Sequence, residues 1–128
     1  MADIQVILSK KSAPRKPSSY ESQAIKAGPH IFVSGQIPAD GEGKLTEGSI
    51  ADKTKACCEG LKNILEEAGS SIGRVVKVTV FLTTMDNFAE MNSVYEKYFT
   101  HKPARSCVAV KELPKGVPVE IEAIALSE

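Results

Sequence analysis

The sequence predicts an α+β domain of order ββαβαββ, with two helices on one face of a mixed, largely antiparallel sheet. Apolar residues alternate with polar ones near both ends of the chain, which is typical of strands. They recur every three or four positions in two internal segments, which is typical of amphipathic helices. Since 128 residues leave room for one hydrophobic core, we expect a single domain over residues 1–128.

The N-terminal third is predicted to contain the first strands. Asp3 to Leu8 fits a strand, and the Ser/Pro/Lys-rich stretch from Ser9 to Ser19 fits a loop. Glu21 to Ala27 and His30 to Gln36 flank Gly28-Pro29, which indicates a β-hairpin with a short turn.

The middle of the chain is predicted to alternate between helix and strand. From Ser49 to Gly69 the apolar residues follow a helical period, and Ser49 with Asp52 three residues later fits a helix cap. Gly69 fits the end of this helix. The β-branched run from Arg74 to Thr83 predicts a central strand. Its face toward the helices is expected to carry Val76, Val78, Val80 and Leu82.

The second helix is predicted over Asp86 to Phe99. Asn87 followed by Glu90 fits its start. Its buried stripe is expected to consist of Phe88, Met91, Tyr95 and Tyr98. Two helices on one face leave the other sheet face uncovered, and a face rich in Ile, Val and Phe predicts a homo-oligomer.

The stretch from Pro103 to Ala125 holds two apolar strands, with Arg105 near the start of the first and Glu120 near the start of the second. Arg105 shares a strand face with Cys107, and if both strands lie in one sheet we expect Arg105 and Glu120 to meet beside a pocket. A guanidinium suits the binding of a carboxylate, and a part-buried glutamate suits water activation. The same two charges could instead form a salt bridge within the sheet.

Three sequence blocks together resemble the RidA family of reactive intermediate deaminases, also called YjgF, in a fungal-type form. They are Val33-Ser34-Gly35-Gln36-Ile37-Pro38, the segment VVKVTVFLTTMDNFAEMNSVYEKYF, and the stretch around Arg105 and Glu120. Three blocks in order and spacing are much harder to obtain by chance than one short motif. The resemblance runs from about Ser18 to the C-terminus.

The resemblance implies a chorismate mutase-like fold, a homotrimer, and sites in the clefts between subunits. It also implies hydrolysis of reactive 2-enamine and 2-imine acids to 2-keto acids and ammonia, as metabolite damage control. Such small molecules are released by pyridoxal phosphate enzymes such as threonine dehydratase. No cofactor and no metal are implied for the reaction itself, because an iminium carbon is already electrophilic.

Site residues carried over from the resemblance fall on matching positions of this chain. Arg105 is expected to bind the substrate carboxylate with the Cys107 backbone N–H, and Glu120 to position or activate the attacking water. The further pocket residues implied are Ser34, Gly35, Phe88 and Asn92. Phe88 and Asn92 could also serve as packing or capping residues.

Tyr20 departs from the pattern of the family it resembles. That family usually has Tyr-x-Gln before its hairpin, whereas here Tyr20 stands three residues before Gln23. A slip of one residue in an extended strand turns a side chain to the opposite face. Tyr20 is therefore expected either to contribute to substrate binding or to cover apolar surface at a subunit junction.

Composition excludes several function classes. The 16 basic residues balance the 16 acidic ones, so specific nucleic-acid binding is not expected, and the cluster Lys10-Lys11…Arg15-Lys16 fits a solvated loop. No membrane segment is expected. Three cysteines without zinc-type spacing indicate neither a disulfide framework nor a metal site. On the first predicted helix, one of Cys57 and Cys58 should face the core and the other should not.

Cys107 is expected to line the pocket rather than act as a nucleophile, because neither His30 nor His101 has a spacing that predicts contact with it. The N-terminus shows no signal or transit peptide, which favours a cytoplasmic protein, with a mitochondrial one possible by family analogy. Two other functions stay open: a non-catalytic regulator or chaperone-like protein that binds small carboxylates in the same cleft, and a ribonuclease or translation inhibitor.

Overall fold

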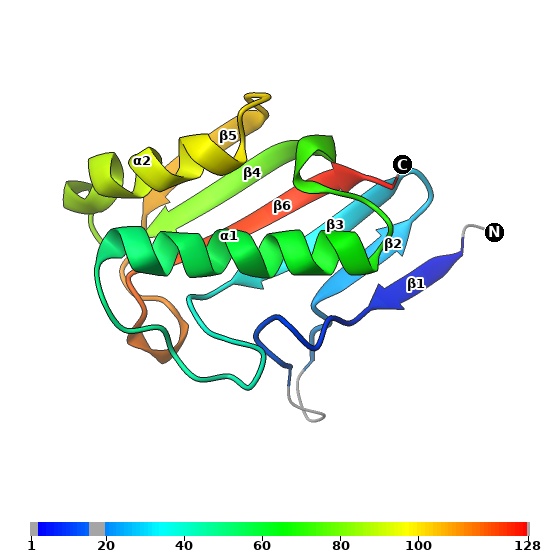
Figure 1. Ribbon diagram of the computed structural model, residues 1–128, viewed down its shortest axis with the longest axis horizontal. Coiled ribbons are helices and arrows are strands. Elements are labelled where there is room, and N and C mark those ends of the chain that lie inside the picture. Colours follow the sequence, from blue (N-terminus) through cyan, green and yellow to red (C-terminus); the bar gives the residue numbers. More distant parts are fainter. Residues whose placement is uncertain (1–2, 16–19, 128) are drawn as a thin grey trace.

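The computed structural model describes residues 3–15 and 20–127. These residues form one six-stranded sheet, with the strands in the order β1-β2-β3-β6-β4-β5. Both helices, α1 (Ile50–Glu67) and α2 (Phe88–Tyr98), lie on the same face of the sheet (Figure 1). The strands are β1 (Ile4–Ile7), β2 (Ala24–Ala27), β3 (His30–Gln36), β4 (Val75–Leu82), β5 (Ala104–Ala109) and β6 (Val119–Leu126). The predicted fold class is confirmed.

The sheet is mixed, because β4 pairs parallel to β5 while the other neighbours pair antiparallel. A parallel pair needs a crossover connection, and here α2 supplies it. β1 pairs with β2 along its whole length, so the predicted order gains a third strand before α1. Gly28, with φ of +59°, begins the two-residue turn of the hairpin between β2 and β3.

The two helices start differently. α1 begins with the predicted capping box, in which Asp52 N donates to Ser49 Oγ and Ser49 N donates to Asp52 Oδ2, each at 3.1 Å. The Asn87 side chain makes no capping bond to α2. Glu90 instead accepts a hydrogen bond of 2.9 Å from Ala51 N, so its carboxylate links the first turns of both helices. The cap predicted for the second helix was therefore wrong.

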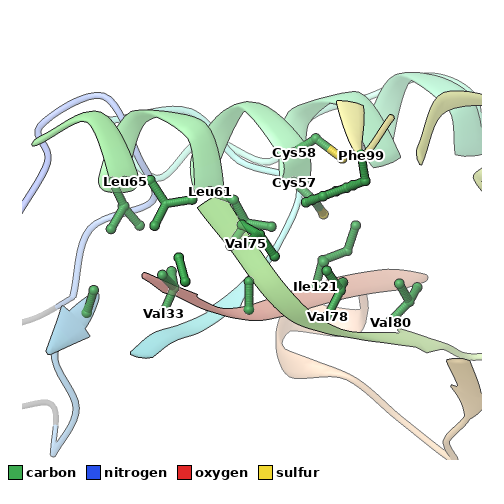
Figure 2. Packing of buried hydrophobic residues seen from close by; sticks show 14 of the residues in the cluster. Val33, Cys57, Cys58, Leu61, Leu65, Val75, Val78, Val80, Phe99 and Ile121 are labelled. Atoms are coloured by element: carbon green, nitrogen blue, oxygen red, sulfur yellow. The ribbon is translucent and has the colours of Figure 1, made fainter. Parts of the chain in front are cut away.

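The core lies between α1 and the sheet. Leu61 and Leu65 of α1 are fully buried above Val33, Val78 and Ile121 (Figure 2). This packing removes from water the apolar face that the helical period predicted.

Cys57 and Cys58 are both fully buried, so the expectation that one would be excluded from the core was wrong. α1 is covered on two sides, by the sheet and by α2, and adjacent helical positions can each face one of them. The Cys57 thiol donates to the Val119 carbonyl of β6 at 3.8 Å, and Cys58 lies beside Phe99 (Figure 2). Burial raises the pKa of Cys58 to about 12, so this thiol is inert at neutral pH.

The strand β4 contains an irregularity that the alternation of apolar residues did not reveal. Its pairing with β6 shifts register between Val75 and Lys77. As a result Val75 is buried at 2% exposure, while Val76, which was expected to face the core, is 42% exposed. The predicted alternation holds from Val78 onward.

Leu61→Ala is expected to lower the free energy of unfolding by about 2–5 kcal/mol, because it leaves a cavity between α1 and the sheet. Urea denaturation checks this value. The control is Glu66→Ala, an exposed position of the same helix, which should change stability by less than about 0.5 kcal/mol. Equal effects of the two substitutions would contradict the packing described here.

The sheet face opposite the helices carries an apolar row. Pairing places Val6, Ile25, Phe32 and Ile124 side by side across four strands. Phe32 is 46% exposed although its neighbours are apolar. A contiguous apolar row on an uncovered sheet face is typical of an association surface. No helix in the described part of the chain is long and apolar enough to cross a bilayer.

Candidate active site

Arg105 lies on the helix-covered side of β5, beneath α2. Its Nη1 donates to Asn92 Oδ1 at 2.6 Å, and its guanidinium carbon lies 4.6 Å from the ring centre of Tyr95 and 5.5 Å from that of Phe88. Within residues 3–15 and 20–127, no carboxylate forms an ion pair with Arg105. The result is a guanidinium that is oriented by an amide and two aromatic rings and is suited to binding an anion.

Glu120 lies half-buried in a cavity of about 480 Å³ on the other side of the sheet. The loop 9–15, the segment 37–43 and the turn 114–116 meet there at one end of the sheet (Figure 1). The side chains that matter for its electrostatics and shape are Arg15, Glu21, Phe81, Lys115 and Glu122. Burial raises the pKa of Glu120 above that of an ordinary glutamate, and Arg15 acts in the opposite direction.

Arg105 and Glu120 lie on opposite faces of the sheet. Arg105 pairs with Val78 of β4, whereas Glu120 pairs with Phe81 of the same strand. Positions 78 and 81 are an odd number of residues apart, so their side chains point to opposite faces. The expectation that the two charges meet beside one pocket of a single chain was wrong, and so was the alternative of a salt bridge between them. β4 lies between β5, which carries Arg105, and β6, which carries Glu120. The register in which β4 pairs with these two strands therefore determines the face to which each side chain points.

The Glu120 side chain packs directly on the backbone of Gly35. A Cβ added to Gly35 would lie 2.7 Å from Glu120 Cδ, which is closer than atoms can approach. Gly35 belongs to a bulge of β3, where two residues stand opposite Glu122 of β6. The missing side chain at Gly35 therefore makes room for the carboxyl group in the cavity.

Residues 10–127 match the family model described as Endoribonuclease L-PSP. The chain belongs to this family. The resemblance to RidA/YjgF proteins inferred from the sequence is thereby confirmed, because this is the same family.

Relatives in the Endoribonuclease L-PSP family share most of the chain. Protein HMF1 of Saccharomyces cerevisiae is 58% identical over 116 residues, which is 90% of this chain and 89% of that protein. The 2-iminobutanoate/2-iminopropanoate deaminase of Salmonella typhimurium is 41% identical over 108 residues, which is 81% of this chain and 84% of the enzyme. The crystal structure of Escherichia coli TdcF with bound serine has a TM-score of 0.89 at 35% identity, covering 95% of this chain and 98% of that one.

Cys107 and Ser34, two further site residues implied by the family resemblance, lie in different parts of the structure. Cys107 is half-buried on the same face of β5 as Arg105, and burial raises the pKa of its thiol while Arg105 lowers it. The Ser34 hydroxyl donates to the Ser22 carbonyl at 2.7 Å and does not line the cavity of Glu120. In this chain Ser34 therefore ties β3 to the segment before β2.

Tyr20 does not join either group of side chains, because it is fully exposed to solvent. The reason lies at Gln23, whose side chain is buried and bonds to the backbone of Ser9 and Ala13 at 2.6–3.1 Å. With Gln23 held in place, Glu21 occupies the position of the L-PSP family tyrosine, two residues earlier, and lines the cavity. The extra residue displaces Tyr20 outward.

Arg15 is a cavity residue that the sequence did not indicate. It was grouped with lysines in a solvated loop, yet its side chain is only 15% exposed. Arg15 lies outside the three sequence blocks that resemble the family. Its position in the sequence does not predict a contact with Glu21 or Gly35. No group of three His, Cys, Asp or Glu side chains within residues 3–15 and 20–127 is arranged to hold a metal ion.

Proposed function

We propose that this protein is a cofactor-independent hydrolase that converts reactive 2-imino and 2-enamine acids to 2-keto acids and ammonia. The observation that carries the proposal is Arg105, a guanidinium oriented by Asn92 and aromatic rings, with no carboxylate partner in the described chain. The name of the Salmonella typhimurium relative supports the reaction and suggests 2-iminobutanoate and 2-iminopropanoate as substrates. The serine bound by Escherichia coli TdcF supports a small ligand with a carboxylate.

The proposed chemistry needs positioning and proton transfer. Arg105 binds the substrate carboxylate through two parallel hydrogen bonds, and the Cys107 N–H adds a third contact. The Glu120 carboxylate takes a proton from water as the water oxygen bonds to the carbon of the protonated imine. Glu120 then gives this proton to the nitrogen of the resulting carbinolamine. As the C–N bond breaks, ammonia leaves and the hydroxyl group returns its proton to Glu120, which yields the 2-keto acid.

One small substrate cannot contact Arg105 and Glu120 of the same chain, because the sheet separates them. We therefore propose a homotrimer in which Arg105 of one subunit and Glu120 of its neighbour line a shared cleft. The uncovered apolar sheet face supports association. Each subunit then supplies an arginine to one cleft and a glutamate to another.

Gly35→Ala is expected to lower kcat/KM by about tenfold or more, because the new methyl group displaces the Glu120 carboxyl. The unfolding free energy should change by less than about 1.5 kcal/mol, since a flexible side chain can move away. Gly73→Ala is the control, because its nearest neighbour, Ser71 Oγ, lies at an ordinary 3.9 Å. Unchanged kcat/KM in Gly35→Ala would show that the position of Glu120 is unimportant.

The activity is expected to fall at low pH. Glu120 must be ionised to accept a proton from water, and burial raises its pKa, so kcat/KM should decline as the pH falls through a value above that of an ordinary glutamate. The profile of kcat/KM between about pH 4 and pH 8 measures this. A flat profile that persists down to the titration of an exposed glutamate would contradict a role for Glu120 as a base.

The test of the function is 2-keto acid formation when the protein is added to threonine dehydratase together with a scavenger that competes for the imine. Acceleration by the wild-type protein is expected. Without acceleration, binding of small carboxylates at Arg105 would favour the non-catalytic binding protein. Cleavage of RNA with salt-sensitive affinity would favour the ribonuclease, which the equal numbers of basic and acidic residues argue against.

We also propose that the protein acts in the cytoplasm or the mitochondrion. A yeast relative that is 52% identical over 122 residues is named mitochondrial MMF1, which supports the second compartment.

A further inference from the structure

Arg15 occupies the same cavity as Glu120 and is held there by the backbone and by a carboxylate. Its Nη2 donates to the Gly35 carbonyl at 2.9 Å, and its Nε lies 3.4 Å from Glu21 Oε1. The Arg15 side chain is 15% exposed and the Glu21 side chain 58%, so the guanidinium is largely buried while its carboxylate partner is open to solvent. Arg15 thereby fastens the loop 9–15 to the bulge of β3.

Arg15 and Glu120 use the same residue as a support. The guanidinium bonds to the carbonyl of Gly35, while the Glu120 side chain packs on its Cα, where a Cβ would lie 2.7 Å from Glu120 Cδ. A cation and a carboxylate are thus placed on one bulge. An opposite charge nearby favours the ionised form of a carboxyl group.

The other charged groups around Glu120 come from several elements. Glu21 precedes β2, Glu122 lies on β6, and Lys115 lies in the turn 114–116. Cys57 of α1 lies against β6 on the helix-covered face, and its buried thiol stays neutral because burial raises its pKa. Glu21 and Glu122 both oppose ionisation of Glu120, as does burial. Arg15 is the guanidinium that counteracts them.

We propose that Arg15 is a positioning residue for Glu120, which fixes the loop 9–15 on the β3 bulge and so keeps a positive charge beside Glu120 that favours its ionised form for proton transfer. The inference rests on the proposed hydrolysis, in which Glu120 accepts the proton of water. The proposed role of Arg15 differs from that of Arg105. The Arg15 guanidinium already contacts Gly35 and Glu21, so it acts on the substrate only through Glu120.

The test compares the pH profiles of kcat/KM for three variants, Arg15→Gln, Glu21→Gln and Lys11→Gln. Arg15→Gln should shift the acid limb to higher pH, with kcat/KM reduced about threefold to tenfold near pH 5 and within about twofold of wild type near pH 8. Glu21→Gln removes a negative charge and should shift the limb the other way. Lys11→Gln removes an exposed charge of the same loop and should leave the profile unchanged.

A uniform loss of kcat/KM at every pH in Arg15→Gln would overturn the inference and indicate that Arg15 binds substrate. An unchanged profile would overturn it as well. If Arg15→Gln does not fold, Arg15→Lys replaces it. Because lysine retains the positive charge, the acid limb of Arg15→Lys should stay near that of wild type. An acid limb shifted to higher pH by as much as is expected for Arg15→Gln would overturn the inference.

Direct titration separates this inference from the proposed function. The Glu120 carboxyl carbon can be followed by NMR in protein labelled with ¹³C, whether or not the protein hydrolyses imines. A higher Glu120 pKa in Arg15→Gln than in wild type is expected. An inactive wild-type protein with this shift would refute the proposed function alone, whereas an active one without the shift would refute the role of Arg15 alone.

Discussion

Arg105→Ala is expected to lower kcat/KM for imine hydrolysis by about a hundredfold or more. The substitution removes the cation that is proposed to bind the substrate carboxylate, and the loss of one partner of a buried, hydrogen-bonded charge pair costs about 2–5 kcal/mol. Arg105→Lys should recover only part of the activity, because an ammonium cannot form two parallel hydrogen bonds or stack between Tyr95 and Phe88.

The measurement is 2-keto acid formation at several substrate concentrations, with light scattering to confirm that the assembly is intact. Lys111→Ala removes an exposed cation just beyond β5 and should have no effect. Dissociation of the Arg105→Ala variant would assign Arg105 to the subunit interface. Retained activity would exclude Arg105 as the carboxylate-binding group.

Glu120→Gln is expected to lower kcat by about 10²–10⁴-fold, which is the usual contribution of a general acid or base. Glutamine has the same shape and can pack on Gly35 as the glutamate does, so the loss should come from chemistry rather than from folding. Because substrate binding is proposed to depend on Arg105, KM should change much less than kcat.

Glu122→Gln is the matched control for this prediction. Glu122 lies two residues further along β6, on the same face, and lines the same cavity. Its substitution should change kcat less than about threefold, since Glu122 affects the reaction only through the charge around Glu120. Comparable losses in both variants would mean that no single carboxylate handles the proton.

Features determined by neighbouring residues were predicted well. The capping box of α1 depends only on Ser49 and Asp52, three positions apart, and both hydrogen bonds are present. The helical period likewise predicted the buried stripe of α1, because each side of a regular helix is determined by spacing alone, but it did not predict that Cys57 and Cys58 are both buried. The cap expected at Asn87 failed, because Glu90 bonds to the other helix instead.

Features determined by strand register could not be predicted. The alternation within one strand defines its two faces only relative to each other, and a shift of one residue exchanges them. The bulge at Val75 and Val76 is such a shift, and the opposite faces of Arg105 and Glu120 follow from the register of β4 between them. The family resemblance assigned these two residues to one site, but their separation within one chain follows from the pairing of the strands.

Contacts made by loops were also beyond the sequence. Arg15 reaches Gly35 across 20 positions of the chain, and Glu21 enters the cavity because the buried side chain of Gln23 holds the segment in place. Loops have no repeating pattern from which such contacts can be derived. For this reason Arg15, which belongs to a short basic cluster, was predicted to lie in a solvated loop.

The proposed shared site requires that Arg105 of one subunit and Glu120 of another act on the same substrate. Its most direct test is to coexpress Arg105→Ala and Glu120→Gln chains with different affinity tags, to purify the mixed trimers, and to measure 2-keto acid formation. Each mixed trimer contains one cleft with both wild-type residues, so about a third of the wild-type activity should return although each parent is nearly inactive. Mixed trimers as inactive as their parents would contradict a site shared between subunits.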